Sequence, residues 1–220
     1  MEKKVITFET EVQASQLKTV LEKNYLTIIT EYFELQRGWL YRAYQPFKDI
    51  DKYLILISLV NRTFNAYKEY FIKMDYDEFY SQSSYEIKKF NVVDISRQLT
   101  ISKETARRKI LELEKLGVLK KEKKNLFLFQ DKLDVQKPNE SIVAISRFMS
   151  SLSKKLKQSK VINKEVPTKE FEQLIKNNYT ICWNIFLEFQ ISLLTDAKVK
   201  FLGDMESWVV YCQIIYNQNL

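Results

Sequence analysis

Four charged side chains crowd two turns of a short segment near the middle of this 220-residue chain: Lys103, Glu104, Arg107 and Arg108. Lysine and arginine donate hydrogen bonds to the groove edge of guanine, and glutamate accepts one from cytosine. A helix that carries such groups at its N-terminal end fits the major groove of double-stranded DNA. The spacing therefore predicts a base-reading face on a helix over about 102–116.

The residues around this cluster predict two helices joined by a tight turn at Thr100-Ile101. Asn91 is a good N-cap for the first helix, and Ser102 is one for the second. Gly117 is the residue type expected just beyond a helix end. The positions expected to face inward, at helical spacing, are Ile95 and Leu99 in the first helix and Ala106, Ile110 and Leu113 in the second.

A basic β-hairpin is predicted directly after the second helix. Val118-Leu119 and Leu126–Phe129 are the expected strands, and residues 120–125 are the expected tip. Ammonium groups at such a tip lie close to backbone phosphates when the preceding helix enters a groove. The lysines expected to make these contacts are Lys120, Lys121, Lys123 and Lys124.

The hexad at 103–108, KETARR, is similar to the R-E-T-V-x-R recognition helix of the cyclic-AMP receptor protein family. The stretch ELEKLGVLK that follows shortly after resembles the helix end and first wing strand of many bacterial winged-helix regulators. By that resemblance, Lys103, Glu104 and Arg108 contact bases, and Ser102 and Thr105 lie near a phosphate. The resemblance covers about 40 residues. No segment resembles that family's glycine-rich nucleotide-binding domain, so cyclic-nucleotide sensing is not expected.

These observations predict a sequence-specific DNA-binding transcription regulator, with double-stranded DNA as its partner. Two alternatives stay open: a protein-interaction adaptor that docks through a winged helix, and a plasmid or phage replication initiator. A charged face on an amphipathic helix is also compatible with a merely solvated surface.

Charge and composition agree with a mainly α fold built around a winged helix-turn-helix. The net charge is +7, and residues 91–130, with ten basic and five acidic side chains, carry +5 of it. Only three glycines and three prolines are present, which favours long helices over a fold with many tight turns.

Enzymatic chemistry is not expected. The chain has no histidine, the commonest general base, and no glycine-rich phosphate loop. Cys182 and Cys212 have no companions that would make a metal site, and we expect two free thiols rather than a disulfide. No cofactor or metal is predicted. The absence of a long apolar run and of a signal-peptide core predicts a cytoplasmic protein without a membrane partner.

The expected organisation is an N-terminal helical region (1–80), the winged helix (81–130), and a linker with a C-terminal helical region (131–220). Helices are expected at about 14–43, with a bend or end at Gly38, and at 53–74, 142–156, 168–195 and 203–216, with a linker at 131–140. Residues 85–90 are interpreted as a lead-in to the winged helix, and as a candidate for its first helix.

The two helical ends resemble each other. Gln16–Leu26 aligns with Glu170–Thr180 at a constant offset, and the match continues to Asp49 and Asp204 after a gap of one residue. This pattern indicates either an internal duplication or chance among amphipathic helices.

Two further surfaces have alternative interpretations. The basic stretch Lys154–Lys164 fits a solvated loop or a second phosphate contact. Seven tyrosines of the helical ends fit a core, a dimer interface or a small-molecule effector pocket. No other observation supports the effector pocket. The seven are Tyr25, Tyr32, Tyr41, Tyr44, Tyr53, Tyr67 and Tyr70. Because helix-turn-helix proteins commonly bind two half-sites, we expect a homodimer through the helical ends.

Overall fold

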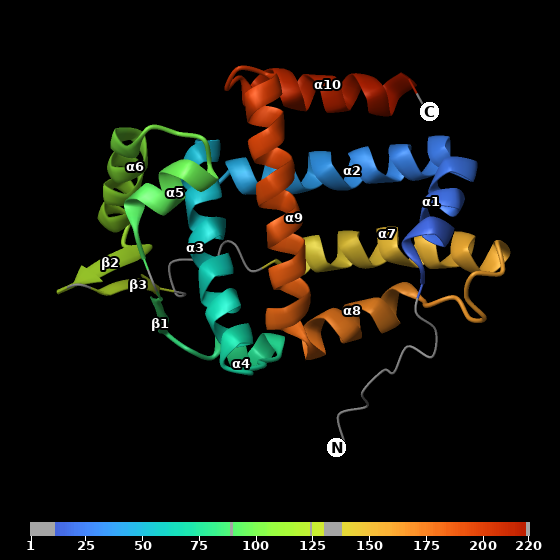
Figure 1. The fold of residues 1–220 in the computed structure, drawn as a ribbon, viewed down its shortest axis with the longest axis horizontal. Helices are drawn as coiled ribbons and strands as arrows, with labels where there is room; N and C mark the ends of the chain where they lie inside the picture. The colour runs from blue at the N-terminus through green and yellow to red at the C-terminus, as the bar shows by residue number, and fades with distance from the viewer. Residues whose placement is uncertain (1–11, 89, 124, 130–137, 219–220) are drawn as a thin grey trace. The chain divides into compact units, whose positions relative to one another are not determined.

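The computed structural model describes residues 12–88, 90–123, 125–129 and 138–218 (Figure 1). Its contacts divide the chain into two compact units. What we call the terminal unit comprises the described residues within 1–40, 138–177 and 209–220, and the central unit comprises those within 41–137 and 178–208. The chain is mainly helical with a small antiparallel sheet, as the sequence predicts. The three-part division into 1–80, 81–130 and 131–220 stays a prediction.

The central unit holds the sheet. After the end of α2, its elements are α3 (Ile50–Glu69), α4 (Tyr76–Tyr80), β1 (Ser84–Ile87), α5 (Val92–Gln98), α6 (Lys103–Lys115), β2 (Leu119–Glu122), β3 (Asn125–Phe129) and α9 (Tyr179–Lys200). The terminal unit consists of α1 (Ala14–Lys23), most of α2 (Tyr25–Tyr44), α7 (Asn139–Gln158), α8 (Thr168–Asn177) and most of α10 (Met205–Gln218).

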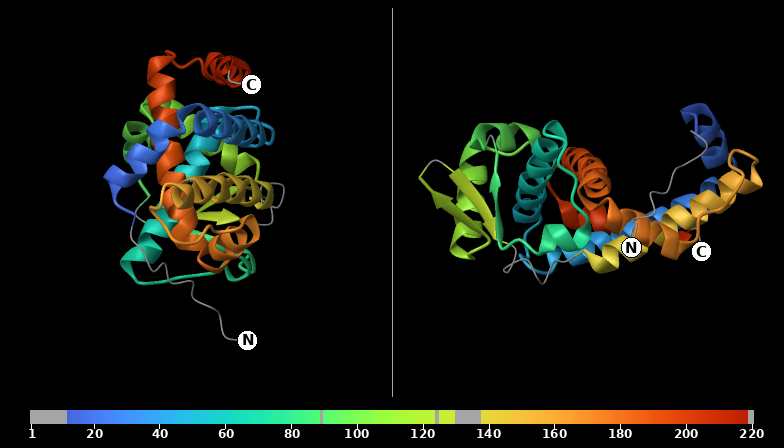
Figure 2. Two further views of the ribbon diagram at one scale, coloured as in Figure 1. Left: turned by 90° about the vertical axis from the view of Figure 1, so that its right-hand side faces the viewer. Right: turned by 90° about the horizontal axis from the view of Figure 1, so that it is seen from below.

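Helix α3 is the core helix of the central unit. The sequence predicts that Asp49 or Asp51 starts this helix and that it runs to about Met74. Asp49 is the cap, since its side chain accepts hydrogen bonds from two backbone amides of the first turn, and the helix ends earlier than predicted, at Glu69. The apolar run Leu54–Leu59 is buried on all sides. Helix α9 covers one side of α3, and α6 with β1 covers another (Figures 1 and 2).

Polar contacts fix how α9 lies on α3. The Asn184 side chain of α9 donates to the Asn61 side-chain oxygen at 2.7 Å and to that of Asn65 at 3.1 Å. At the other end of the contact, Lys198 forms an ion pair with Asp51 in the first turn of α3. A buried side-chain amide that loses its hydrogen-bond partner destabilises the fold. These contacts therefore specify how far α9 is shifted along α3, as well as bringing the two helices together.

The sheet has three antiparallel strands in the order β1-β3-β2. Ser84 faces Phe129 across the first pair, and Leu119 faces Leu128 across the second. The interpretation of residues 85–90 as a helix is therefore wrong. Tyr85 and Ile87 alternate with exposed or half-buried neighbours and are themselves buried, which is the two-residue period of a strand.

The predicted pair of helices in the middle of the chain is confirmed. Asn91 caps α5 by accepting from the Val93 amide, and Ser102 caps α6 by accepting from the Thr105 amide. The turn between them passes through Thr100, whose φ is 53°, and Gly117 follows α6 with φ 74°. All five positions expected to face inward are buried: Ile95, Leu99, Ala106, Ile110 and Leu113.

The two longest predicted helices are each broken by an asparagine. The helix expected over 14–43 is divided at Asn24, and the one expected over 168–195 is divided at Asn178. Gly38 lies inside α2 and neither ends nor divides it. Of the linker expected at 131–140, residues 131–137 lie outside the described residues, and Asn139 already begins α7.

These breaks occupy equivalent positions of the aligned ends. Asn24 (φ −112°, ψ 24°) and Asn178 (φ −124°, ψ 37°) have nearly the same backbone conformation. Lys48 and Leu202, also equivalent, are both left-handed, with φ 49° and 52°. Asp204 accepts from the Ser207 amide just as Asp49 caps α3. These shared breaks and turns agree with the alignment of α1–α3 with α8–α10, and the internal duplication stays a prediction.

In the terminal unit, α7 packs on α8 and also contacts α1 and α2. Glu31 of α2 accepts hydrogen bonds from Ser151 and Lys155 of α7, at 2.8 and 3.2 Å. Cys182 and Cys212 are free thiols, as predicted. Among the described residues, no helix has both the length and the apolar character needed to cross a membrane.

Leu113 and Leu111 offer a matched test of this packing on one helix. Leu113 is fully buried, whereas Leu111 is 49% exposed. We expect Leu113→Ala to lower the free energy of unfolding by about 2–5 kcal/mol, because it leaves a cavity in the core. Leu111→Ala is expected to change it by no more than about 0.5 kcal/mol. Urea denaturation followed by circular dichroism measures both values, and equal losses would contradict the orientation of α6.

Candidate nucleic-acid interface

The N-terminal end of α6 is organised by its capping serine. Ser102 Oγ accepts from the Thr105 amide at 3.0 Å and donates to Thr105 Oγ1 at 2.9 Å. The two hydroxyls expected near a phosphate are thus paired with each other. They hold the first turn in a fixed conformation at a helix end, where an anion is favoured.

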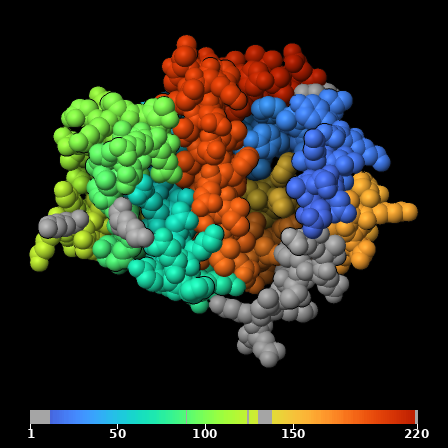
Figure 3. All heavy atoms as spheres, viewed as in Figure 1, coloured from blue at the N-terminus to red at the C-terminus, as the bar shows by residue number. Residues whose placement is uncertain are grey.

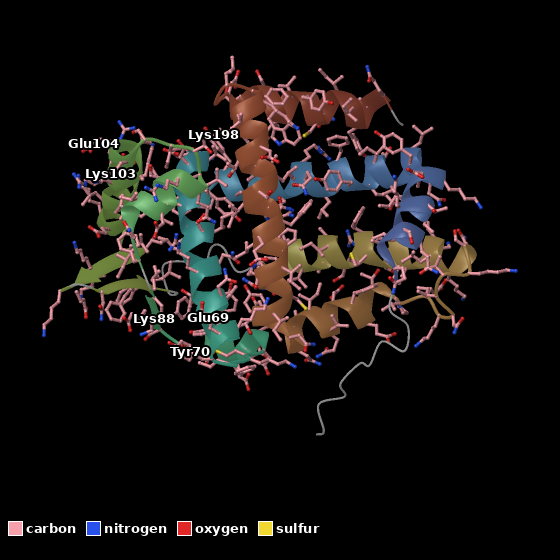
Figure 4. All side chains as sticks on the ribbon, viewed as in Figure 1. Glu69, Tyr70, Lys88, Lys103, Glu104 and Lys198 are labelled. Carbon is pink, nitrogen blue, oxygen red and sulfur yellow. The ribbon has the colours of Figure 1, made fainter. Side chains whose placement is uncertain are left out.

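The outer side of α6 carries all four charged residues predicted to contact bases. Lys103 and Glu104 project from its first turn (Figure 4), and Arg107 and Arg108 follow one turn later, all four exposed. In the space-filling view, the α5–α6 region lies at the surface of the central unit (Figure 3). The inner side of α6 is buried, so the helix has one buried face and one free cationic face.

Intramolecular ion pairs hold these cations only loosely. Arg107 lies 3.9 Å from Glu104, and Arg108, whose side chain is 68% exposed, lies 3.9 Å from Glu112. Exposed pairs at this distance contribute at most about 1 kcal/mol each. The guanidinium groups are therefore available to an external acceptor at little cost.

The hairpin differs from the predicted basic tip. Lys120 and Lys121 belong to β2, and the turn is shorter than expected, with Lys123 in the left-handed conformation at φ 56°. Lys124 lies outside the described residues. Successive strand residues point to opposite faces of the sheet, so Lys120, which pairs with Glu122 at 2.7 Å, faces away from Lys121. The predicted lysines of the hairpin therefore do not form a single face.

Behind the exposed face, an ionic network fastens α6 to the first turn of α3. The ammonium group of Lys109 contacts the Asp49 carboxylate, and Lys52 lies 2.8 Å from Glu112. Glu112 also lies within 4.0 Å of both Lys109 and Arg108. This network could not be predicted from local sequence patterns, because Lys109 and Asp49 are 60 positions apart.

The network shifts the pKa values of its carboxylates downward. Burial by itself would raise the pKa of Asp49, but hydrogen bonds from the Lys109 side chain and the Lys52 amide outweigh this effect and lower it. The hydrogen bond from Lys52 is the main cause of the lowered pKa of Glu112. Both carboxylates are therefore ionised in the folded protein at neutral pH.

The other candidate surfaces are less concentrated. In the basic stretch Lys154–Lys164, Lys157 lies 3.7 Å from Glu165, and Lys164 lies 3.7 Å from Glu170, which lowers its net positive charge. Four of the seven tyrosines considered for an effector pocket are exposed at the surface: Tyr25, Tyr41, Tyr44 and Tyr70. Within the described part of the chain, no group of histidine, cysteine and acidic side chains is arranged to hold a metal ion.

Comparisons with protein-family models, with curated proteins and with solved structures found no match. The interpretation of this surface therefore depends on its own residues and geometry.

The lowered carboxylate pKa values predict how stability depends on pH. A group whose pKa falls on folding stabilises the protein above its ordinary pKa, and this contribution is lost as the pH falls through the lowered value. We expect the free energy of unfolding to decrease below about pH 4. In Lys109→Met, which removes the partner of Asp49, the decrease should be smaller, with a loss of about 1–3 kcal/mol at pH 7.

Urea titrations at several pH values measure this dependence. Lys115→Met is the matched control, because Lys115 lies exposed in the last turn of the same helix. If Lys109→Met kept the full pH dependence of the unchanged protein, the network would not stabilise the fold.

Proposed function

We propose that this protein is a sequence-specific DNA-binding regulator of transcription, with α5, α6 and the β2–β3 hairpin acting as a winged helix-turn-helix. The observation that carries this proposal is the division of α6 into a buried face and a free cationic face. Ala106, Ile110 and Leu113 anchor the helix, while Lys103 and Arg108 remain accessible. A reading helix needs both properties, since it must be rigid and uncovered at once.

In the proposed complex, the first two turns of α6 lie in the major groove. Lys103, Arg107 and Arg108 donate to guanine N7 and O6 or to phosphates, and Glu104 accepts from a cytosine amino group. Entry into the groove replaces the 3.9 Å contact of Arg108 with Glu112 by a hydrogen bond to a base. Ser102 and Thr105, joined at the helix end, lie nearest to a backbone phosphate.

The hairpin supplies contacts that position the protein without reading sequence. Lys121 in β2 and Lys123 in the turn after it are both exposed and have no acidic partner among the ion pairs described, so we assign the phosphate contacts mainly to them. Lys120 lies on the other side of β2 from Lys121 and is partly neutralised by Glu122. Each phosphate neutralised releases condensed counterions, so affinity falls as salt is added.

The ionic network contributes by holding the reading helix at a defined angle on α3. Lys109 and Glu112 lie beside the exposed cations, and their partners Asp49 and Lys52 belong to the first turn of the best-buried helix of the unit. Rotation of α6 would break both pairs, and Lys109 and Asp49 would lose their partners where little water can replace them. The protein acts as a homodimer in this proposal, each copy binding one half-site, and no catalytic role is assigned.

A second candidate, a protein-interaction adaptor, is favoured by one observation. Leu111 and Leu116 of α6 are both exposed, and Leu111 lies one turn beyond Arg107 on the same side. Apolar residues beside cations fit an acidic protein partner, although a leucine also fits the methyl group of thymine. A selection from random DNA duplexes at physiological salt separates the two functions, because an adaptor enriches no sequence.

Arg108 is predicted to read a base. On the selected site, Arg108→Ala should weaken binding by about 1–3 kcal/mol and relax the preference at one position of the site. Fluorescence anisotropy on the selected duplex and on its single-base variants measures both effects. A uniform weakening over all variants would assign Arg108 to the backbone instead.

Lys123 is predicted to contact phosphate. Lys123→Ala should weaken binding to all sequences by similar factors and reduce the salt dependence of the binding constant by about one counterion. Lys18→Ala, which removes an exposed lysine of α1, is the control and should leave affinity and salt dependence unchanged. If Arg108→Ala and Lys123→Ala had the same small effect, the proposed roles would be wrong.

A further inference from the structure

Leu111 is an apolar residue on the charged side of α6. It is 49% exposed, and every other exposed residue from Lys103 to Lys115 is charged. Its neighbours one helical turn away are the exposed Arg107, Arg108 and Lys115, together with the half-buried Glu114. The exposed part of Leu111 therefore lies in a surround that is mainly cationic.

Leu111 continues the row of residues that we propose to face the groove. Glu104, Arg107, Arg108 and Leu111 are spaced i, i+3, i+4 and i+7, which places them along one side of the helix over two turns. Helices that lie in the major groove contact bases with residues at this same spacing. The next position of the row after Arg108 is therefore also directed towards the bases, and it is occupied by a leucine.

The backbone at Leu111 is held in place by its neighbours on both sides. Ile110 and Leu113 are buried in the core, and Glu112 lies 2.8 Å from Lys52 of α3. An apolar contact with a single small group requires such a fixed backbone, because dispersion attraction is lost when the two surfaces separate by a fraction of an ångström. Leu111 therefore has the exposure and the rigidity that contact with one group on a base requires.

We propose that Leu111 determines sequence specificity by contacting the C5-methyl group of a thymine in the major groove. The groove edges of the bases carry hydrogen-bond donors and acceptors, and the thymine methyl is the apolar group among them. A leucine placed against donors and acceptors alone would remove water from them without replacing its hydrogen bonds. A leucine that enters the groove beside Arg108 is therefore favoured opposite a thymine. This inference rests on the proposed function and extends it to one more base.

Helix geometry predicts where this thymine lies in the binding site. Leu111 is three residues beyond Arg108, about 4.5 Å along the helix axis, and successive bases of a strand are about 3.4 Å apart. The thymine is therefore expected about one or two base pairs from the base that Arg108 contacts. Burial of one methyl group against an apolar side chain corresponds to a change in affinity of about 3- to 10-fold.

Replacement of thymine by deoxyuridine tests the contact, because the two bases form the same base pair and differ only in the methyl group. Each thymine of either strand of the selected duplex is replaced in turn, and binding is measured by fluorescence anisotropy. For the unchanged protein, one replacement near the base contacted by Arg108 should weaken binding about 3- to 10-fold. Leu111→Ala should weaken binding to the unmodified duplex by a similar factor and should be insensitive to that replacement.

Leu116→Ala is the matched control on the same helix. Leu116 is 53% exposed, but it lies nine residues beyond Arg107 and hence on the opposite side of α6. This variant should keep the full effect of the deoxyuridine replacement. Both leucines are exposed, so neither substitution is expected to unfold the protein, and circular dichroism verifies this.

The results distinguish this inference from the proposed function. If a sequence is selected but no deoxyuridine replacement weakens binding, or if Leu111→Ala keeps the full effect, the contact of Leu111 is wrong and the proposed function stands. If no sequence is selected, the proposed function is wrong and the thymine contact is wrong with it. That last result is the one expected of an adaptor that binds an acidic protein.

Discussion

The attachment of α6 to the first turn of α3 is the constraint on which the candidate interface depends. Apolar contacts of Ile110 and Leu113 anchor the helix on the core, but apolar attraction by itself is not directional. The pairs Lys109–Asp49 and Lys52–Glu112 add direction, and the first pair has little access to water, so its charges must keep their partners. The same residues that orient the helix also keep its cationic side outward.

The first turn of α3 serves both of its neighbours. Asp49 caps the helix and binds Lys109 of α6, and two residues later Asp51 binds Lys198 of α9. The Asn61–Asn184 contact then fixes α9 further along the same helix. One turn of helix therefore connects the two elements that enclose the core of the central unit, through residues two positions apart.

Local features were predictable from the sequence, and features that depend on distant partners were not. The caps Asn91 and Ser102 and the end at Gly117 were predictable because capping acts within three residues. β1 was missed because its four residues become a strand only by pairing with β3, some 40 positions away. The ionic network behind α6 was missed for the same reason, and a basic tip was predicted where strand geometry divides the lysines between two faces.

Pairing of β1 with β3 has a consequence for the history of the chain. Ser84 enters the sheet directly opposite Phe129, so the segment between them begins and ends at neighbouring points. This segment lies between the two stretches that the alignment matches, Gln16–Asp49 and Glu170–Asp204. A segment with adjacent ends can be added to a loop of an existing protein without separating the parts that flank it. Residues 84–129 therefore form a piece of chain whose two ends meet, and α3 supplies the surface against which that piece packs.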